Sequence, residues 1–191
     1  MRYLLWAEGT SDAGLCEVLN WLLAKNHVDV TEAVSVTKAD YPTLEKLLNR
    51  EWAHLLFLHW DADSDQEIAG KGPRTRRQKL KEWIHEATVA LPPTICVIPV
   101  QEIEAWLLTQ TDLPLAHIEA QTSPKEKLKA ILEQKQRSTM TKEKFSEQRQ
   151  QLWAQLVQNT EALRRLESLP AFQQLVTDTT EAIRRHGLTQ H

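Results

Sequence analysis

The first 110 residues alternate short apolar runs with segments of helical periodicity, and this alternation constrains the fold more than any other feature. The apolar runs are typical of buried strands and cover residues 2–7, 30–36, 54–60 and 94–100. Between them, apolar residues recur every three or four positions, as expected for amphipathic helices. Strands that alternate with helices predict an α/β fold with a mainly parallel sheet and helices on both of its faces.

The helical segments divide the chain into two regions. In the first region, helices are predicted over 12–25, 42–49, 74–90 and 101–108. After residue 112 the strand-like runs disappear, and helices are predicted over 125–134, 142–158 and 169–185. We therefore expect a four-stranded α/β domain over 1–112, with an all-helical extension over 113–191 packed on it.

Composition narrows the class of protein. The 191 residues carry 23 Lys and Arg against 26 Asp and Glu, a net charge of −3, which excludes a uniformly basic nucleic-acid coat but not a local basic patch. No apolar run approaches the roughly 20 residues of a membrane span, and the first residues do not resemble a secretory signal. Cys16 and Cys96 lack the spacing of a zinc site or a disulfide framework. These features predict a cytoplasmic protein.

Acidic residues follow three of the four predicted strands. Glu8 follows the first, Asp61 and Asp63 follow the third, and Glu102 and Glu104 follow the fourth. Ligands of parallel α/β sheets bind at the carboxyl ends of the strands, so these side chains are expected to converge at one edge.

Asp61 and Asp63 stand two residues apart. In an extended backbone, both side chains would lie on the same side, about 7 Å apart along the chain. Clustered carboxylates repel one another unless a positive charge lies between them. Mg²⁺ prefers carboxylate oxygens, so the pattern predicts a Mg²⁺ site, with Mn²⁺ as a substitute.

The same residues resemble a known family. The segment Glu8-Gly9-Thr10-Ser11-Asp12, followed by Asp61-Ala62-Asp63, resembles the TOPRIM pattern of a Glu after the first strand and an Asp-x-Asp after a later one. The resemblance is closest to the nuclease branch typified by the overcoming-lysogenisation-defect proteins. The segment PVQEIEAWLL (99–108) also resembles a motif of small bacterial TOPRIM-like proteins. The similarity covers about residues 1–110 and implies a TOPRIM-like sheet.

The resemblance also implies an activity, a Mg²⁺-dependent nuclease that cleaves phosphodiester bonds. Its catalytic residues would be Glu8, Asp61 and Asp63. Its metal ligands would be Glu8, Asp12, Asp61, Asp63, Glu102 and Glu104. Such proteins often act with an ATPase and often belong to anti-phage or mobile-element systems. This chain has no GxxxxGK[ST] motif, so the resemblance implies that any ATPase would be a separate subunit.

A basic segment follows the third strand. The candidate nucleic-acid contacts in it are Lys71, Arg74, Arg76 and Arg77. These side chains could grip phosphates beside the acidic residues, or they could simply form a solvated helix face.

Other interpretations remain open from the sequence. Asp12 could cap a helix, Glu102 and Glu104 could interact with a helix dipole, and His59 could pack in the core. A non-catalytic TOPRIM-like module that binds nucleic acid or an ATPase partner is an alternative function. A phosphatase-like or receiver-like domain is a third, and a homo-oligomer is compatible with any of them.

Overall fold

The computed structural model describes residues 1–188, apart from the side chain of Ser11. Its sheet consists of β1 (Arg2–Ala7), β2 (Glu32–Thr37), β3 (Leu55–His59) and β4 (Thr94–Val97). All strands are parallel, in the order β2-β1-β3-β4. The predicted α/β class and four-stranded sheet are confirmed. The fourth strand is shorter than predicted, because the chain leaves the sheet after Val97.

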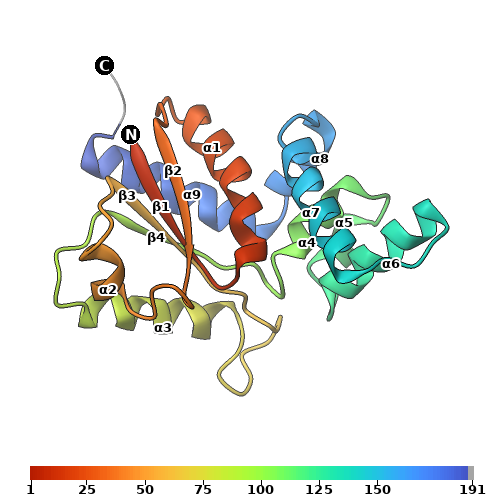
Figure 1. Cartoon of the computed structure of the whole chain (residues 1–191), viewed down its shortest axis with the longest axis horizontal. Coiled ribbons are helices and arrows are strands. Elements are labelled where there is room, and N and C mark those ends of the chain that lie inside the picture. Colours follow the sequence, from red (N-terminus) through yellow and green to blue (C-terminus); the bar gives the residue numbers. More distant parts are fainter. Residues whose placement is uncertain (189–191) are drawn as a thin grey trace.

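Helices cover both faces of the sheet (Figure 1). The helices that connect the strands are α1 (Leu15–Lys25), α2 (Leu44–Leu48) and α3 (Pro73–Glu86). Alternate β1 residues Tyr3 and Leu5 pack in the core that includes α1, whereas Leu4 and Trp6 pack in the core that includes α2 and α3. Strands that are buried on both faces have continuous apolar sequences, which explains the short apolar runs in the first 110 residues.

The order of the strands creates a switch point between β1 and β3. The chain leaves β1 across one face to reach β2, and then returns across the other face to place β3 on the opposite side of β1. Neighbouring strands whose connections depart in opposite directions leave a crevice at their carboxyl ends, where doubly wound sheets bind ligands. The residues after β1 and β3 therefore occupy the favoured position for a site.

The rest of the described chain is helical. It contains α4 (Glu104–Leu107), the 3₁₀ helix Leu108–Gln110, α5 (Leu115–Ile118), α6 (Pro124–Gln136), α7 (Lys142–Leu156), α8 (Thr160–Glu167) and α9 (Pro170–His186). The helices α5 and α8 were not predicted. Arg165 of α8 donates hydrogen bonds to the carbonyls of Thr111 and Leu113, which ties this helix to the segment after α4. None of the helices within residues 1–188 is long and apolar enough to cross a membrane.

The last helix, α9, returns to the sheet (Figure 1). Phe172, Leu175 and Ile183 of α9 share one core with Ile95 and Val97 of β4 and with the apolar face of α1. The helical part of the chain therefore supplies one of the layers that bury the sheet.

A second contact joins α7 to the turn after β1. The 3₁₀ helix Thr10–Gly14 precedes α1, where a single α-helix was predicted over 12–25. Trp153 of α7 lies against Gly14, and a Cβ atom at position 14 would come within 2.1 Å of the Trp153 ring. Only a glycine allows this approach.

Candidate functional site

Glu8 and Asp61 meet at the switch point of the sheet. Glu8 follows β1 and Asp61 follows β3, and these two strands are direct neighbours. The backbone N–H of Asp61 donates a hydrogen bond of 3.1 Å to Oε2 of Glu8. The structure thus brings together two acidic residues that lie 53 positions apart in the sequence.

His59, the last residue of β3, is fully buried between two carboxylates. Its Nε2 lies 3.2 Å from Oδ1 of Asp61, and its Nδ1 lies 3.4 Å from Oδ2 of Asp12. Burial alone would lower the pKa of His59, but the interactions with Asp12 and Asp61 outweigh burial and raise the pKa to about 10. A buried position was expected for His59, whereas its role as a cation that links two candidate site residues was not.

Asp61 is held firmly in place. Its Oδ1 also accepts a hydrogen bond of 2.9 Å from the backbone N–H of Ile103, in the loop after β4. Burial raises the pKa of Asp61 to about 6, although the contact with His59 acts in the opposite direction. The side chain is still 19% exposed, and no residue in the described part of the chain donates a hydrogen bond to its Oδ2.

Asp12 combines a local structural role with a contact to the site. Its Oδ2 accepts a hydrogen bond of 2.9 Å from the backbone N–H of Gly9, and its own N–H donates to the carbonyl of Gly9 at 3.1 Å. This reciprocal pair resembles a capping box and closes the turn after β1. The same carboxylate contacts His59, so Asp12 helps to fix the histidine that holds Asp61.

Asp63 is not in the extended backbone that its spacing from Asp61 suggested. Strand β3 ends at His59, and Asp63 has a left-handed backbone with a φ of 58°. Its N–H donates to the carbonyl of Gln101 at 3.0 Å, which fixes the turn. Its Oδ2 forms an ion pair of 2.7 Å with Arg76 of α3. The expectation that both aspartates project from one extended strand is therefore wrong.

Glu102 and Glu104 face the C-terminal helices. Glu104 is buried and forms an ion pair with Arg149 of α7. Glu102 accepts a hydrogen bond of 3.0 Å from the backbone N–H of Lys125 at the start of α6, and its pKa is raised by burial. Both carboxylates bind helical segments, which gives each a structural role at the border of the site.

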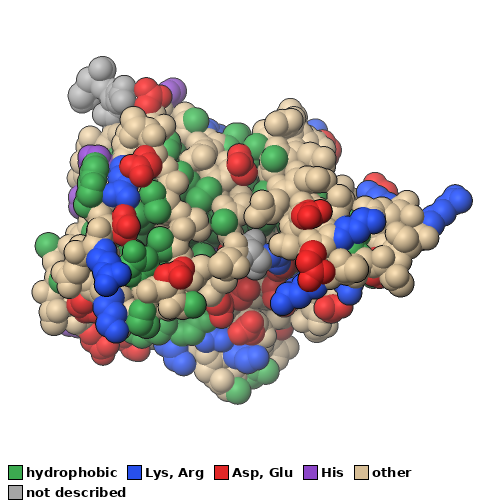
Figure 2. Space-filling view, in the orientation of Figure 1, with side chains coloured by type: hydrophobic (Ala, Val, Ile, Leu, Met, Phe, Trp, Pro, Cys, Tyr) green, Lys and Arg blue, Asp and Glu red, His purple; other side chains and the backbone are tan. Residues whose placement is uncertain are grey.

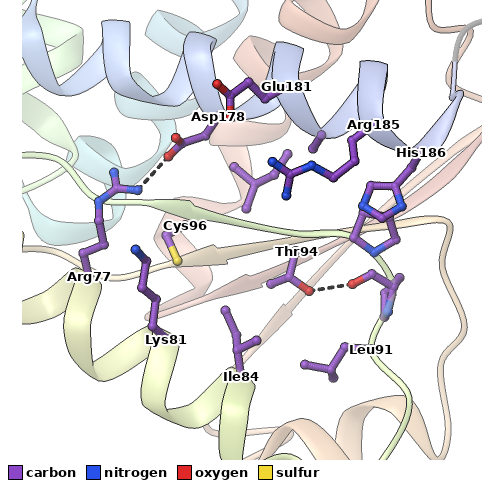
Figure 3. A pocket seen from close by; sticks show the side chains of 14 residues that line it. Arg77, Lys81, Ile84, Leu91, Thr94, Cys96, Asp178, Glu181, Arg185 and His186 are labelled. Carbon is purple, nitrogen blue, oxygen red and sulfur yellow. Dashed lines mark hydrogen bonds and ion pairs between the residues drawn. The ribbon is translucent and has the colours of Figure 1, made fainter.

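The basic segment splits between two sides of the molecule. Arg76 points to Asp63 and lies with its guanidinium carbon 4.4 Å from the centre of the Trp60 ring. Arg77 instead forms an ion pair of 2.6 Å with Asp178 of α9, at a groove of about 630 Å³ beside β4 (Figure 3). Lys71 and Arg74 are exposed near the start of α3. Only Arg76 contacts a candidate acidic residue directly.

Lys38 was missed by the sequence analysis. It directly follows β2, as Glu8 directly follows β1, so a basic and an acidic residue extend from two neighbouring strands at this edge of the sheet. Burial lowers the pKa of Lys38 to about 8, while the nearby charges of Glu8 and Asp61 act in the opposite direction. Its position two residues after the predicted strand 30–36 was the available signal, but one lysine in a loop has no distinguishing pattern in the sequence.

Three tryptophans surround the Lys38 ammonium group. Its Nζ lies 4.0 Å from the centre of the Trp60 ring, 5.3 Å from Trp83 and 5.7 Å from Trp6. Trp60 and Trp83 are stacked with ring centres 4.6 Å apart. Such contacts stabilise a cation that has lost part of its water. We call Trp6, Trp60, Trp83 and Lys38 the tryptophan cluster.

Acidic and basic side chains crowd together in the hollow between the sheet and the C-terminal helices (Figure 2). Across the described residues, however, no three His, Cys, Asp or Glu side chains are arranged as a ready-made metal site. The candidate carboxylates instead contact His59, Arg76 and backbone N–H groups.

Comparisons with known proteins add no family to this description. No protein-family model, no curated protein and no solved structure matches the chain.

Proposed function

We propose that this chain is a metal-dependent nuclease whose site lies at the carboxyl ends of β1 and β3. The observation that carries the proposal is the junction of Glu8 and Asp61 at the switch point of the sheet, with Lys38 and Arg76 beside them. Carboxylates bind a hard cation, and adjacent cationic side chains bind phosphate oxygens. The resemblance of the EGTSD and DAD segments to TOPRIM nucleases supports the same activity.

The donor atoms suit Mg²⁺ or Mn²⁺. Glu8, Asp61 and Asp63 would hold the ion, because each presents carboxylate oxygen at this edge, and Asp61 Oδ2 accepts no hydrogen bond from another described residue. When bound, the ion would supply Lewis-acid stabilisation of the phosphate and a more acidic water. Arg76 pairs with Asp63 and would balance part of the negative charge of the carboxylates beside a bound ion.

The residues of the chain itself would bind and orient the substrate. Lys38 and Arg76 would contact the phosphate, and their position over Trp60 keeps both cations near the carboxylates. His59 would keep Asp61 oriented, because its Nε2 contacts Oδ1 and leaves Oδ2 without a contact to the imidazole. Asp12 would hold His59 from the other side. Preorganised charges of this kind stabilise a phosphoryl transition state.

A cleavage assay tests the proposal. The wild type and the Asp61→Asn/Asp63→Asn variant are incubated with single-stranded and double-stranded DNA and RNA, each with Mg²⁺, Mn²⁺ or EDTA. We expect metal-dependent cleavage that falls at least about 100-fold in the variant, as for the loss of a principal electrostatic group. The control is Asp29→Asn/Asp112→Asn, which removes two exposed carboxylates elsewhere. Equal cleavage by both variants would refute the assigned site.

One observation favours a second candidate, a non-catalytic module that binds nucleic acid. Asp61 and Asp63 are paired with His59 and Arg76, and no three described side chains are grouped for a metal. In that case nucleic acid would bind equally well in EDTA, and no cleavage would occur with either metal. The same panel of substrates, read by a gel-shift assay, separates the two functions. A separate ATPase subunit, which is the partner that the resemblance implies, can be added in the same assay.

A further inference from the structure

A small cavity opens beside the tryptophan cluster, between the carboxyl ends of β1 and β2 and the helices α2 and α3. Its volume is about 190 Å³. The lining consists of Trp6, Lys38, Pro42, Thr43, Leu44, Glu45, Trp83 and Glu86. Sites for drug-sized ligands measure about 300–1,000 Å³, so this cavity suits a single ring system.

Aromatic walls make the cavity suitable for a flat ligand. Trp83 borders the cavity and is itself stacked against Trp60, so its ring is held in position. Trp6 is fixed by a hydrogen bond of 2.9 Å from its Nε1 to the carbonyl of Tyr41. Flat heterocycles stack on such rings, and a preorganised wall reduces the entropy cost of binding.

The polar groups of the lining select among flat ligands. Glu86 offers carboxylate oxygens, which accept hydrogen bonds, and Lys38 offers N–H donors. Glu45 and Thr43 are partly engaged, since Glu45 Oε1 accepts a hydrogen bond of 3.2 Å from the Thr88 N–H and the Thr43 hydroxyl accepts one of 3.3 Å from the Lys46 N–H. An organic cation would suit the carboxylates but would be repelled by the Lys38 ammonium group. A neutral heterocycle with an amino group and a ring nitrogen satisfies both kinds of lining group. Adenine, cytosine and guanine have these features, whereas uracil and thymine lack the amino group.

The cavity is also connected to the candidate site. Lys38 lines the cavity and, at the same time, lies within electrostatic reach of Glu8 and Asp61. A ligand with its ring in the cavity would therefore place an attached phosphate on the side of the carboxylates, near Lys38 and Arg76.

We propose that this cavity binds one nucleobase with an exocyclic amino group. The inference rests on the proposed function, because it assigns the base to the nucleotide whose phosphate occupies the candidate site. A base inside the cavity has left its stack, so the substrate class would be a single-stranded or locally unpaired nucleic acid. Glu86 is the selecting residue, since it lines the cavity from the last residue of α3 and, unlike Glu45, has no hydrogen bond or ion pair with another residue of 1–188.

Quenching of tryptophan fluorescence tests binding directly, because Trp83 and Trp6 border the cavity. The ligands are AMP, CMP, UMP, ribose 5-phosphate, which lacks a base, and choline, an organic cation. We expect saturable quenching by AMP and CMP with affinities at least about 5-fold higher than for UMP, the discrimination expected from one hydrogen bond. Glu86→Ala should remove this preference. Glu82→Ala, one turn earlier on α3 and outside the lining, is the matched control and should retain it.

The outcomes separate this inference from the proposed function. If the wild type cleaves nucleic acid but AMP and CMP do not quench, or if Glu86→Ala and Glu82→Ala behave alike, the nucleobase site is refuted and the nuclease stands. If nucleotides quench in a Glu86-dependent manner and no nucleic acid is cleaved with either metal, the cavity is confirmed and the nuclease fails. Quenching by choline in preference to CMP would refute the nucleobase site.

Discussion

Nε2 of His59 lies 3.2 Å from Oδ1 of Asp61, although the two residues are separated by a single position at the end of β3. The pairing fixes the end of β3 in position, because the imidazole of His59 is fully buried and also contacts Asp12. The chain thereby places a buried cation under the carboxylates of its candidate site.

Replacement of His59 by leucine should destabilise the protein. The substitution leaves two carboxylates in the protein without their cation, and loss of one partner of a buried pair costs about 3–5 kcal/mol. The loss should shrink at acidic pH, because Asp61, whose pKa is raised to about 6 by burial, becomes protonated there. Urea denaturation at neutral and acidic pH measures the free energy of unfolding. The control is His85→Leu, at an exposed position on α3. A loss below about 1 kcal/mol for His59→Leu would show that the pair contributes little.

The pair between Glu104 and Arg149 should behave as a structural unit. Arg149→Met alone leaves a buried carboxylate and should cost about 3–5 kcal/mol, whereas the double variant Arg149→Met/Glu104→Leu should recover most of that loss. Denaturation of both variants tests this expectation. Metal-dependent cleavage should persist in the double variant. Loss of cleavage in a folded double variant would instead indicate that Glu104 is a metal ligand.

Gly14→Ala should weaken the contact between α7 and the turn after β1. The new methyl group would lie 2.1 Å from Cδ1 of Trp153, so one of the two elements has to move. Overpacking of this kind costs about 1–3 kcal/mol. Trp153→Leu makes room for the methyl group, so the cost of Gly14→Ala should fall in that background. A double-mutant cycle by chemical denaturation checks the coupling, and additive effects would contradict it.

Lys38 should make the free energy of unfolding depend on pH in the alkaline range. Its pKa falls from 10.5 to about 8 on folding, chiefly through burial. Between these pH values the unfolded chain keeps a proton that the folded chain has lost, so the free energy of unfolding contributed by Lys38 rises with pH. The stability of the wild type relative to Lys38→Met should therefore increase over this window. Lys81→Met, at an exposed position on α3, should show no such trend, and a flat difference for Lys38→Met would contradict the prediction.

The sheet was predictable because parallel strands buried on both faces leave an unmistakable apolar pattern. The segments RYLLWA and HLLFLHW cover β1 and β3, and the acidic residues after them meet as expected. The strand order was not predictable from these segments. It depends on which face each connecting helix covers, and that choice is made by packing between residues distant in sequence.

Local backbone geometry explains most of the differences between the structure and the predictions from the sequence. The left-handed φ of Asp63 follows from a hydrogen bond to Gln101 and an ion pair with Arg76, which are partners that no local pattern identifies. Adjacent Arg76 and Arg77 point to different sides because successive residues of a helix do not share a face. Helix α3 was predicted to extend to residue 90 but ends at Glu86, since Ala87 adopts an extended backbone.

The placement of α9 over the sheet also affects how the protein is made. Strands β1 to β4 leave the ribosome first, yet the face formed by Tyr3, Phe57 and Val97 is completed only when Phe172 and Ile183 reach it. Until then, a nascent chain carries a sheet whose apolar surface is covered only in part, by α1, the kind of intermediate that chaperones bind and that aggregates when released early. Synthesis of the last helix, rather than of the last strand, is the step that ends this exposure.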